Sequence, residues 1–301
     1  MIEYDEFSYF RENATEAGLP WRGPPIVRRE EVRVDGRVVS ALIWGETAPE
    51  IVLLHGGGQN AHTWDTVALA LGRSLVAVDL PGHGHSAWRD DGRLLPHDHA
   101  ATIEPVLRQL APDAELIVGM SLGGLSAIAL AARAPDLVRR LAIVDVLPAV
   151  DRERAADVVA FLSGPQEFES FDAILERTIQ FNPSRTESSL RRGVLHNAVE
   201  QPDGTWRWRY QRLTGGEGVL ADAVPDFGAL WGDLEQVDVP LLLVRGGDSP
   251  VVADDDVAEL LRRQPSARVE VVAGAGHSIQ GDRPVELARL LDDFSRATMG
   301  S

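Results

Sequence analysis

Short apolar runs that recur between helical stretches most strongly limit what this chain can fold into. Each run is only a few residues long and rich in Val, Ile and Leu, as in parallel strands buried on both faces. The intervening stretches have helical spacing and few helix breakers. The alternation predicts an α/β fold, an open and mostly parallel sheet covered by helices. We place strands at residues 51–54, 75–79, 116–118, 141–144, 241–244 and 269–272, and helices at 63–71, 102–110, 122–133, 254–263 and 285–294.

Two departures from this rhythm define the domain organisation. Residues 26–34 and 38–44 flank Asp35-Gly36, a dipeptide that favours a tight hairpin, so we expect the sheet to start antiparallel. After residue 147, roughly 80 residues pass before the next strand, far more than a connection of ordinary length. We expect these residues to form a helical cap over the strand ends. The predicted division is an N-terminal extension (1–25), a core (26–147 and 232–301) and an inserted cap (148–231).

The cap carries an aromatic group at alternating positions. Trp206, Trp208 and Tyr210 follow a Pro-Asp-Gly turn signal and are separated by arginines. Aromatic side chains mostly serve burial, so we expect them to pack the cap against the core. Contact with a substrate is the alternative.

Composition excludes several classes of function. The chain has 301 residues with 29 basic and 46 acidic ones, and its formal net charge of −17 argues against nucleic acid as a partner. Every basic residue is arginine and cysteine is absent, which excludes Schiff-base lysines, thiolate nucleophiles and disulfides. The N-terminus begins with acidic residues and no apolar run is long enough to span a membrane, so we expect a cytoplasmic protein without membrane contact. The oligomeric state stays open.

The first motif with chemical meaning surrounds Ser121. A buried strand precedes it, an alanine-rich helix follows it, and Gly119 and Gly123 lie two positions to either side. This is the spacing of a nucleophile elbow, in which the flanking positions have no room for a β-carbon. The alternative is a serine that only caps a helix. We expect Ser121 to be an exposed nucleophile at a helix N-terminus, where the helix dipole favours an anionic intermediate.

A glycine loop follows the strand at residues 51–54. His55 is followed there by three glycines, whose backbone amides can approach a substrate oxygen closely. We expect the amides of Gly57 and Leu122 to form the oxyanion hole, with Gly58 replacing Gly57 if the loop register differs. We expect His55 to organise the loop rather than to act as a base.

An acid and a base are expected at the ends of later strands. His277 follows the last strand in a glycine loop, and Asp248 follows the strand at 241–244. His277 would take the proton of Ser121 and return it to the leaving group, while Asp248 would orient the imidazole. Asp145, which ends the strand at 141–144, is the rival acid.

The remaining histidines raise the question of a metal. His83 and His85 lie in a loop after a strand, and His97 and His99 follow shortly. The sequence offers no cysteine and no His-Glu-x-x-His pattern, and these histidines form no evident set of three zinc ligands. We therefore expect them to order the loop, and we predict neither metal nor organic cofactor.

These blocks together resemble the α/β-hydrolase superfamily over about residues 26–300, and the loop Asp79-Leu80-Pro81-Gly82-His83-Gly84 with Ser86 is also similar to that family. The resemblance implies an α/β-hydrolase fold with a helical cap, close to serine esterases, enol-lactonases, cofactor-free haloperoxidases and carbon–carbon bond hydrolases. A serine at position 121 argues against dehalogenases and epoxide hydrolases, which use aspartate there. Gln59 and Asn60 replace the Pro-Gly of many carbon–carbon hydrolases.

The sequence thus predicts a serine hydrolase that forms an acyl-enzyme. Its expected substrate is a small uncharged or weakly polar carboxylic ester or lactone. A perhydrolase (haloperoxidase) or a carbon–carbon bond hydrolase on the same triad is the alternative within enzymes. A non-catalytic small-molecule receptor on a hydrolase scaffold is the alternative from another class.

Overall fold

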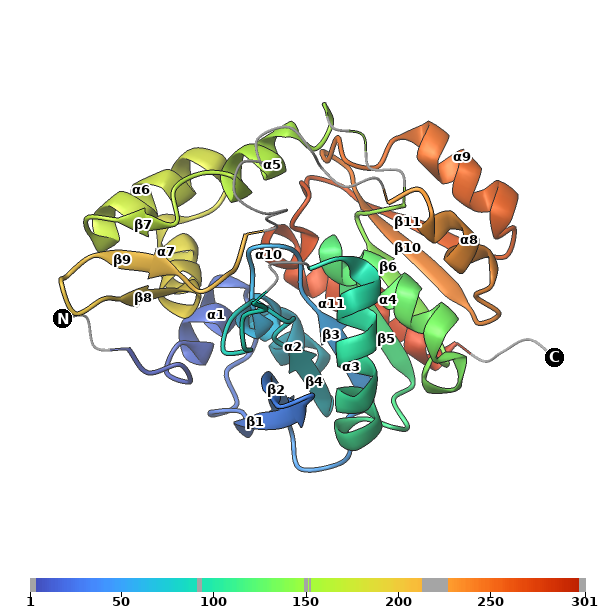
Figure 1. Ribbon diagram of the computed structural model, residues 1–301, viewed down its shortest axis with the longest axis horizontal. Coiled ribbons are helices and arrows are strands. Elements are labelled where there is room, and N and C mark those ends of the chain that lie inside the picture. Colours follow the sequence, from blue (N-terminus) through green and yellow to red (C-terminus); the bar gives the residue numbers. More distant parts are fainter. Residues whose placement is uncertain (1–3, 91–93, 149–150, 152, 213–226, 298–301) are drawn as a thin grey trace.

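A sheet of eight strands forms the centre of the molecule (Figure 1). The computed structural model describes residues 4–90, 94–148, 151, 153–212 and 227–297. The strand order is β1-β2-β4-β3-β5-β6-β10-β11. The strands are β1 (Val27–Val34), β2 (Arg37–Trp44), β3 (Ile51–Leu54), β4 (Leu75–Val78), β5 (Leu116–Met120), β6 (Leu141–Val144), β10 (Leu241–Gly246) and β11 (Arg268–Val272).

The sheet starts antiparallel and continues parallel, as predicted. β1 pairs antiparallel with β2, and β2 with β4, whereas every later pair is parallel. Asp35 and Gly36 both have positive φ, 50° and 79°, which a two-residue hairpin turn of type I′ requires. The predicted open, mostly parallel α/β sheet is confirmed, and β3 and β6 match their expected bounds.

Helices cover both faces of the sheet with separate apolar cores. On one face α3 and α8 pack against α4, and on the other α1 and α11 pack against α2. The strands contribute alternate residues to the two cores, for example Val52 to one and Leu53 to the other. The core helices are α1 (Phe10–Glu16), α2 (Asp65–Leu71), α3 (Pro96–Leu110), α4 (Leu122–Arg133), α8 (Leu230–Glu235), α9 (Asp254–Arg263), α10 (Ile279–Asp282) and α11 (Pro284–Arg296), with short 3₁₀ turns η1 (Ala61–Trp64) and η2 (Pro135–Leu137).

The described elements between β6 and α8 form a separate group beside the sheet, toward the upper left of Figure 1. The cap was expected to be helical, but it also contains a three-stranded antiparallel sheet in the order β7-β9-β8. Residues 149–150, 152 and 213–226 of the expected cap lie outside the described residues. Its elements are α5 (Ala156–Leu162), β7 (Glu167–Phe168), α6 (Phe171–Phe181), α7 (Glu187–Asn197), β8 (Ala198–Glu200) and β9 (Trp206–Trp208).

The aromatic group is buried, but mostly within the cap itself; among the described residues, only Tyr210 of this group also contacts the core, at His83, as the sequence analysis expected for the whole group. Trp206, Trp208 and Tyr210 are 7%, 3% and 1% exposed and join the apolar cluster of the cap. The expected end of the cap at residue 231 falls inside α8, whose Leu230 and Trp231 are buried in the core cluster around α4. A helix that buries its apolar face there packs as a core helix.

The N-terminal extension is tied to both parts. Phe10 is buried and meets Trp44 edge-on, with ring centroids 4.9 Å apart. From α7, Arg192 reaches across to Asn13, Glu12 and Glu16 of α1. The extension therefore contacts both the core and the cap.

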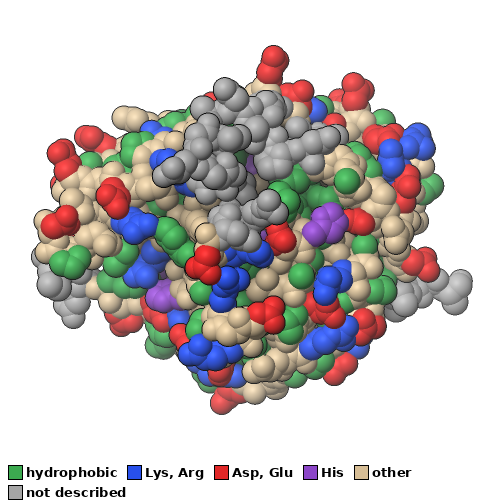
Figure 2. All heavy atoms as spheres, viewed as in Figure 1, with side chains coloured by type: hydrophobic (Ala, Val, Ile, Leu, Met, Phe, Trp, Pro, Cys, Tyr) green, Lys and Arg blue, Asp and Glu red, His purple; other side chains and the backbone are tan. Residues whose placement is uncertain are grey.

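Among the described residues, no helix has the length and apolar character needed to cross a bilayer. Arginine and acidic side chains are interspersed over the face seen in Figure 2.

Candidate active site

Ser121 lies on the sharp turn that the sequence predicted between β5 and α4. Its φ is 51° and its ψ −121°, a conformation that is costly for a residue with a side chain. A β-carbon on Gly119 would clash with the carbonyl oxygen of Gly123, and one on Gly123 would clash with that of Leu54. The prediction that both flanking positions exclude a β-carbon is confirmed.

His277 connects Ser121 to a buried carboxylate. Its Nε2 lies 3.1 Å from Ser121 Oγ, and its Nδ1 lies 2.8 Å from Asp145 Oδ2. Because the carboxylate accepts the Nδ1 proton, Nε2 is left to accept the serine hydroxyl proton. The hydrogen bonds therefore align a nucleophile, a base and an acid.

The partner of His277 is Asp145, not Asp248 as the sequence analysis expected. Asp145 is fully buried, and its other hydrogen bonds come from the Gly246 amide, at 2.8 Å, and the Ser249 hydroxyl. Asp248 is exposed, and its amide donates to Ala275 O. The end of β10 and the loop after it therefore donate hydrogen bonds to Asp145, and they do not themselves provide the acid.

Strand register explains this correction. Val144 of β6 pairs with Met120 of β5, so Asp145 and Ser121 leave the sheet at equivalent positions on adjacent strands. Val144 also pairs with Val244 of β10, and Asp248 comes four residues after Val244. Asp145 also has a positive φ of 51°, unusual for a non-glycine residue and frequent at functional sites.

The glycine loop after β3 lies beside the nucleophile. A β-carbon on Gly56 would come 3.3 Å from Ser121 Cβ, and one on Gly57 would come 3.9 Å from Leu122 Cδ2. The Gly56 amide donates to Gln59 Oε1, 3.1 Å away. In the part of the chain that the structure describes, no hydrogen bond occupies the amides of Gly57, Gly58 or Leu122, which leaves them able to bind a substrate oxygen.

Two polar side chains to which the sequence analysis assigned no role, Asn197 and Gln280, bind this loop. Asn197, at the end of α7, donates to Gly58 O and accepts from Asn60 Nδ2. Gln59 accepts from Gln280 Nε2 at 3.3 Å as well as from Gly56. Only the fold brings α7 and α10 to the loop, so sequence spacing carries no signal for these contacts.

His55 organises the same loop, as expected. Its Nδ1 donates to Gly56 O at 2.7 Å, and its Nε2 accepts from the Leu80 amide at 2.9 Å. Complete burial lowers its pKa to about 4, so the ring is neutral and both nitrogens are engaged. Burial also lowers the pKa of His83 and of His99 to about 3.

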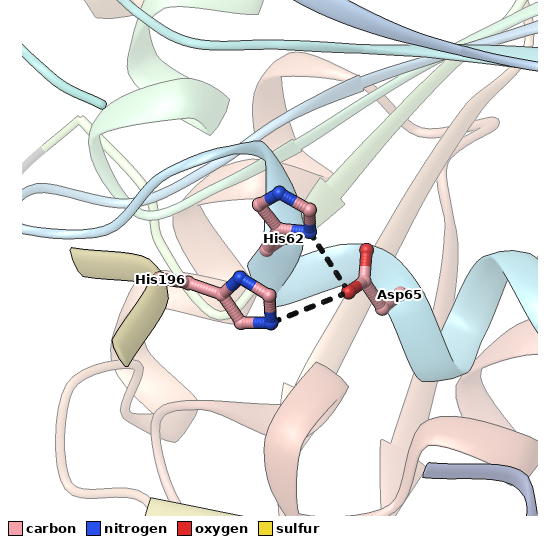
Figure 3. A group of neighbouring side chains, drawn as sticks. All are labelled: His62, Asp65 and His196. Atoms are coloured by element: carbon pink, nitrogen blue, oxygen red, sulfur yellow. Dashed lines mark hydrogen bonds and ion pairs between the residues drawn. The ribbon is translucent and has the colours of Figure 1, made fainter. Parts of the chain in front are cut away.

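Among the described residues, one group of three side chains has metal-ligand composition: His62, Asp65 and His196 (Figure 3). His62 Nδ1 donates to Asp65 Oδ2 at 2.9 Å, and Tyr4 donates its hydroxyl proton to His196 Nδ1 at 2.8 Å. The two imidazoles stack at 12°, with centroids 3.9 Å apart. Nearly parallel rings cannot both direct their in-plane lone pairs at one ion, so the present arrangement suits a hydrogen-bonded network better than a metal site.

A cavity of about 1270 Å³ opens between the site and the cap. Ser121, His277 and the glycine loop line it from the core, and α5, α6 and α7 line it from the cap. Leu162 of α5 packs against the Gly57–Gly58 segment, 3.5 Å from a β-carbon placed on Gly57. The cap therefore shapes the space beside the nucleophile.

Comparison with known proteins agrees with this architecture. The family model described as "Alpha/beta hydrolase family" matches residues 51–290. The chain is 48% identical to the esterase Rv0045c of Mycobacterium tuberculosis, over 95% of this chain and 94% of that protein. A crystal structure of that esterase superposes with a TM-score of 0.82 at 47% identity, covering 97% of this chain and 98% of that one.

A more distant relative is the Xenopus laevis protein named sn-1-specific diacylglycerol lipase ABHD11, 29% identical over 82% of this chain and 79% of its own. The predicted hydrolase is confirmed by the family match and by the mycobacterial relative. With the family model covering most of its length, the chain belongs to the α/β hydrolase family.

Proposed function

We propose that this protein is a serine esterase that cleaves a small carboxylic ester or lactone through an acyl-enzyme. The supporting observation is the hydrogen-bonded series Ser121–His277–Asp145, whose serine and histidine line the cavity. The name of the mycobacterial relative supports the same reaction class.

In the proposed mechanism Ser121 Oγ attacks the ester carbonyl while His277 Nε2 takes the hydroxyl proton. The imidazolium then gives that proton to the leaving alcohol, and an acyl group remains on Ser121. A water that loses its proton to His277 hydrolyses the acyl-enzyme and restores the serine. Asp145 orients the ring and stabilises its charged form; this assignment replaces the expected one of Asp248.

The tetrahedral intermediate carries a negative oxygen, for which we propose the amides of Gly57 and Leu122 as donors. The Leu122 amide is at the N-terminus of α4, where the helix dipole adds to the stabilisation. Loss of one such donor typically costs about a hundredfold or more in rate.

The other reactions open to this site share its first step. A perhydrolase would use peroxide in place of water on the same acyl-enzyme, and a carbon–carbon hydrolase would release a carbanion in place of an alcohol. A receptor would bind without turnover.

We further propose a cytoplasmic protein that does not bind nucleic acid, since the net charge of −17 repels phosphate backbones.

Labelling with a fluorophosphonate tests the mechanism. The expected adduct lies on Ser121, and Ser121→Ala should remove both the adduct and ester hydrolysis while the circular dichroism spectrum is retained. Ser126→Ala, one turn into α4 where Ser126 only donates to Leu122 O, is the matched control and should keep both. Turnover by Ser121→Ala at more than a few per cent of the wild-type rate would reject the proposal.

A further inference from the structure

One arginine in the cavity wall lacks a counter-ion. Arg185 precedes α7 and lines the cavity that contains Ser121. It is half-buried, and its guanidinium donates to Ser189 Oγ at 2.9 Å, while its Nε is buried without a hydrogen-bond partner. The structure gives it no ion pair with any described acidic side chain.

The two carboxylates that act most strongly on Arg185 are already engaged. Asp282 and Glu16 favour its charged form from a distance. Asp282 accepts from the Gly276 amide at 2.9 Å, and Glu16 pairs with Arg192. Burial is the largest influence on Arg185 and lowers its pKa. A guanidinium stays charged in proteins, so it is held here partly desolvated without a compensating anion.

The other arginines that line the cavity either form an ion pair or are solvated by water. Arg154 pairs with Asp256, and Arg192 pairs with Glu12 and Glu16. Arg283 and Arg289 are exposed, so water solvates their charge. Arg185 thus combines partial burial, an unused donor and a position facing the cavity.

The guanidinium of Arg185 lies against Gly281, close in the chain to the proposed base His277. A β-carbon on Gly281 of α10 would lie 2.8 Å from both Cζ and Nη1 of Arg185. Gly281 is four residues after His277, so their Cα atoms are at most about 15 Å apart. The charge therefore lies within reach of a substrate whose carbonyl group is at Ser121.

We propose that Arg185 binds a carboxylate on the substrate, so that this enzyme prefers esters whose acyl chain ends in an anionic carboxyl group. This inference rests on the proposed esterase function, and it replaces the uncharged substrate expected from the sequence. A carboxylate matches a single guanidinium in charge and can accept two N–H groups from one. Nη2 of Arg185 donates to Ser189, whereas Nη1 has no hydrogen bond to a described residue and is not among the buried atoms, so Nη1 is the donor that a carboxylate in the cavity would engage.

The test compares two series of 4-nitrophenyl esters with acyl chains of about four to ten carbons. One series ends in a free carboxylate and the other in the methyl ester of that carboxylate. At the best chain length we expect kcat/KM for the carboxylate to exceed that for its neutral partner by about tenfold or more. High salt should reduce this preference, because it screens the charge of a half-buried group.

Three variants test whether Arg185 causes the preference for esters with a terminal carboxylate. Arg185→Met should abolish the preference and leave hydrolysis of the neutral esters within about threefold of wild type. Arg185→Lys should keep part of it, because lysine retains the charge but loses the two-pronged geometry. Arg289→Met, at an exposed arginine of the same cavity, is the control and should keep it. A preference that survives Arg185→Met, or falls equally in Arg289→Met, overturns the proposal.

A binding experiment separates this proposal from the esterase function. Titration of linear dicarboxylates into Ser121→Ala protein by calorimetry should show binding that Arg185→Met removes in the double variant. If wild type hydrolyses no ester while this binding is seen, the esterase proposal fails and the carboxylate site stands. If wild type hydrolyses neutral esters without preferring a carboxylate at any length, the carboxylate site is wrong and the esterase proposal stands.

Discussion

The imidazole Nδ1 of His277 lies 2.8 Å from the buried carboxylate of Asp145, 132 residues earlier in the chain. Asp145→Asn should therefore lower kcat by about a thousandfold or more, because an amide no longer fixes the tautomer or balances the imidazolium. Asp248→Asn is the matched comparison and should have a much smaller effect, since its side chain is exposed. Steady-state kinetics on a 4-nitrophenyl ester measures both, and the reverse ranking would return the acid role to Asp248.

Leu162 of the cap should control the size of the acyl group. Leu162→Ala removes the side chain packed over Gly57 and Gly58, so the space beside the nucleophile grows. We expect kcat/KM for branched or long acyl chains to rise relative to acetate, while acetate changes by less than about threefold. Leu261→Ala, at an exposed leucine outside the cavity, is the control. An equal loss for every ester in folded Leu162→Ala protein would mean that the cap contributes to the chemistry.

His62 should make stability fall as the solution becomes alkaline. Despite opposing desolvation, Asp65 and Glu6 raise its pKa from 6.5 to about 9, so the folded protein holds the proton more tightly than the unfolded chain. The stabilisation is complete below pH 6.5 and is lost as the pH rises through 9. Urea unfolding at pH 6.5 and pH 9.5 measures the loss.

A variant without the imidazole tests this assignment. His62→Asn should flatten the free energy of unfolding between pH 6.5 and pH 9, because no imidazole at position 62 is left to release a proton. Most of the other buried histidines, including His55, His83 and His196, have lowered pKa values, so they destabilise the fold only at acidic pH. An unchanged slope in His62→Asn would show that other groups release the protons.

Ester hydrolysis should survive removal of metal ions. The proposed mechanism obtains its nucleophile, base, acid and oxyanion donors from the chain itself, so a catalytic metal has no step to perform. The test is to treat the protein with a chelator, verify metal content by elemental analysis, and measure rates before and after adding zinc or manganese. A rate that disappears with the metal and returns with it would contradict the serine mechanism.

The sequence by itself determined the parts whose signal is local. Strands such as residues 51–54 and the nucleophile turn follow from short-range patterns, because burial on both faces and a missing β-carbon constrain neighbouring residues directly. His277 was found in the same way, as a histidine in a glycine loop after the last strand.

Tertiary structure decided the contacts between distant segments. Both Asp145 and Asp248 follow a strand, and only the register among β5, β6 and β10 shows that Asp145 leaves the sheet level with Ser121. The roles of Asn197 and Gln280 carried no signal either, since the loop residues that they bind, Gly58 and Gln59, lie 139 and 221 residues away in the chain. Arg185 carried none because only the fold places it in the wall of the cavity beside Gly281. Local patterns fix where a chain turns and which faces it buries, but the side chains that meet at a site depend on how the strands and cap assemble.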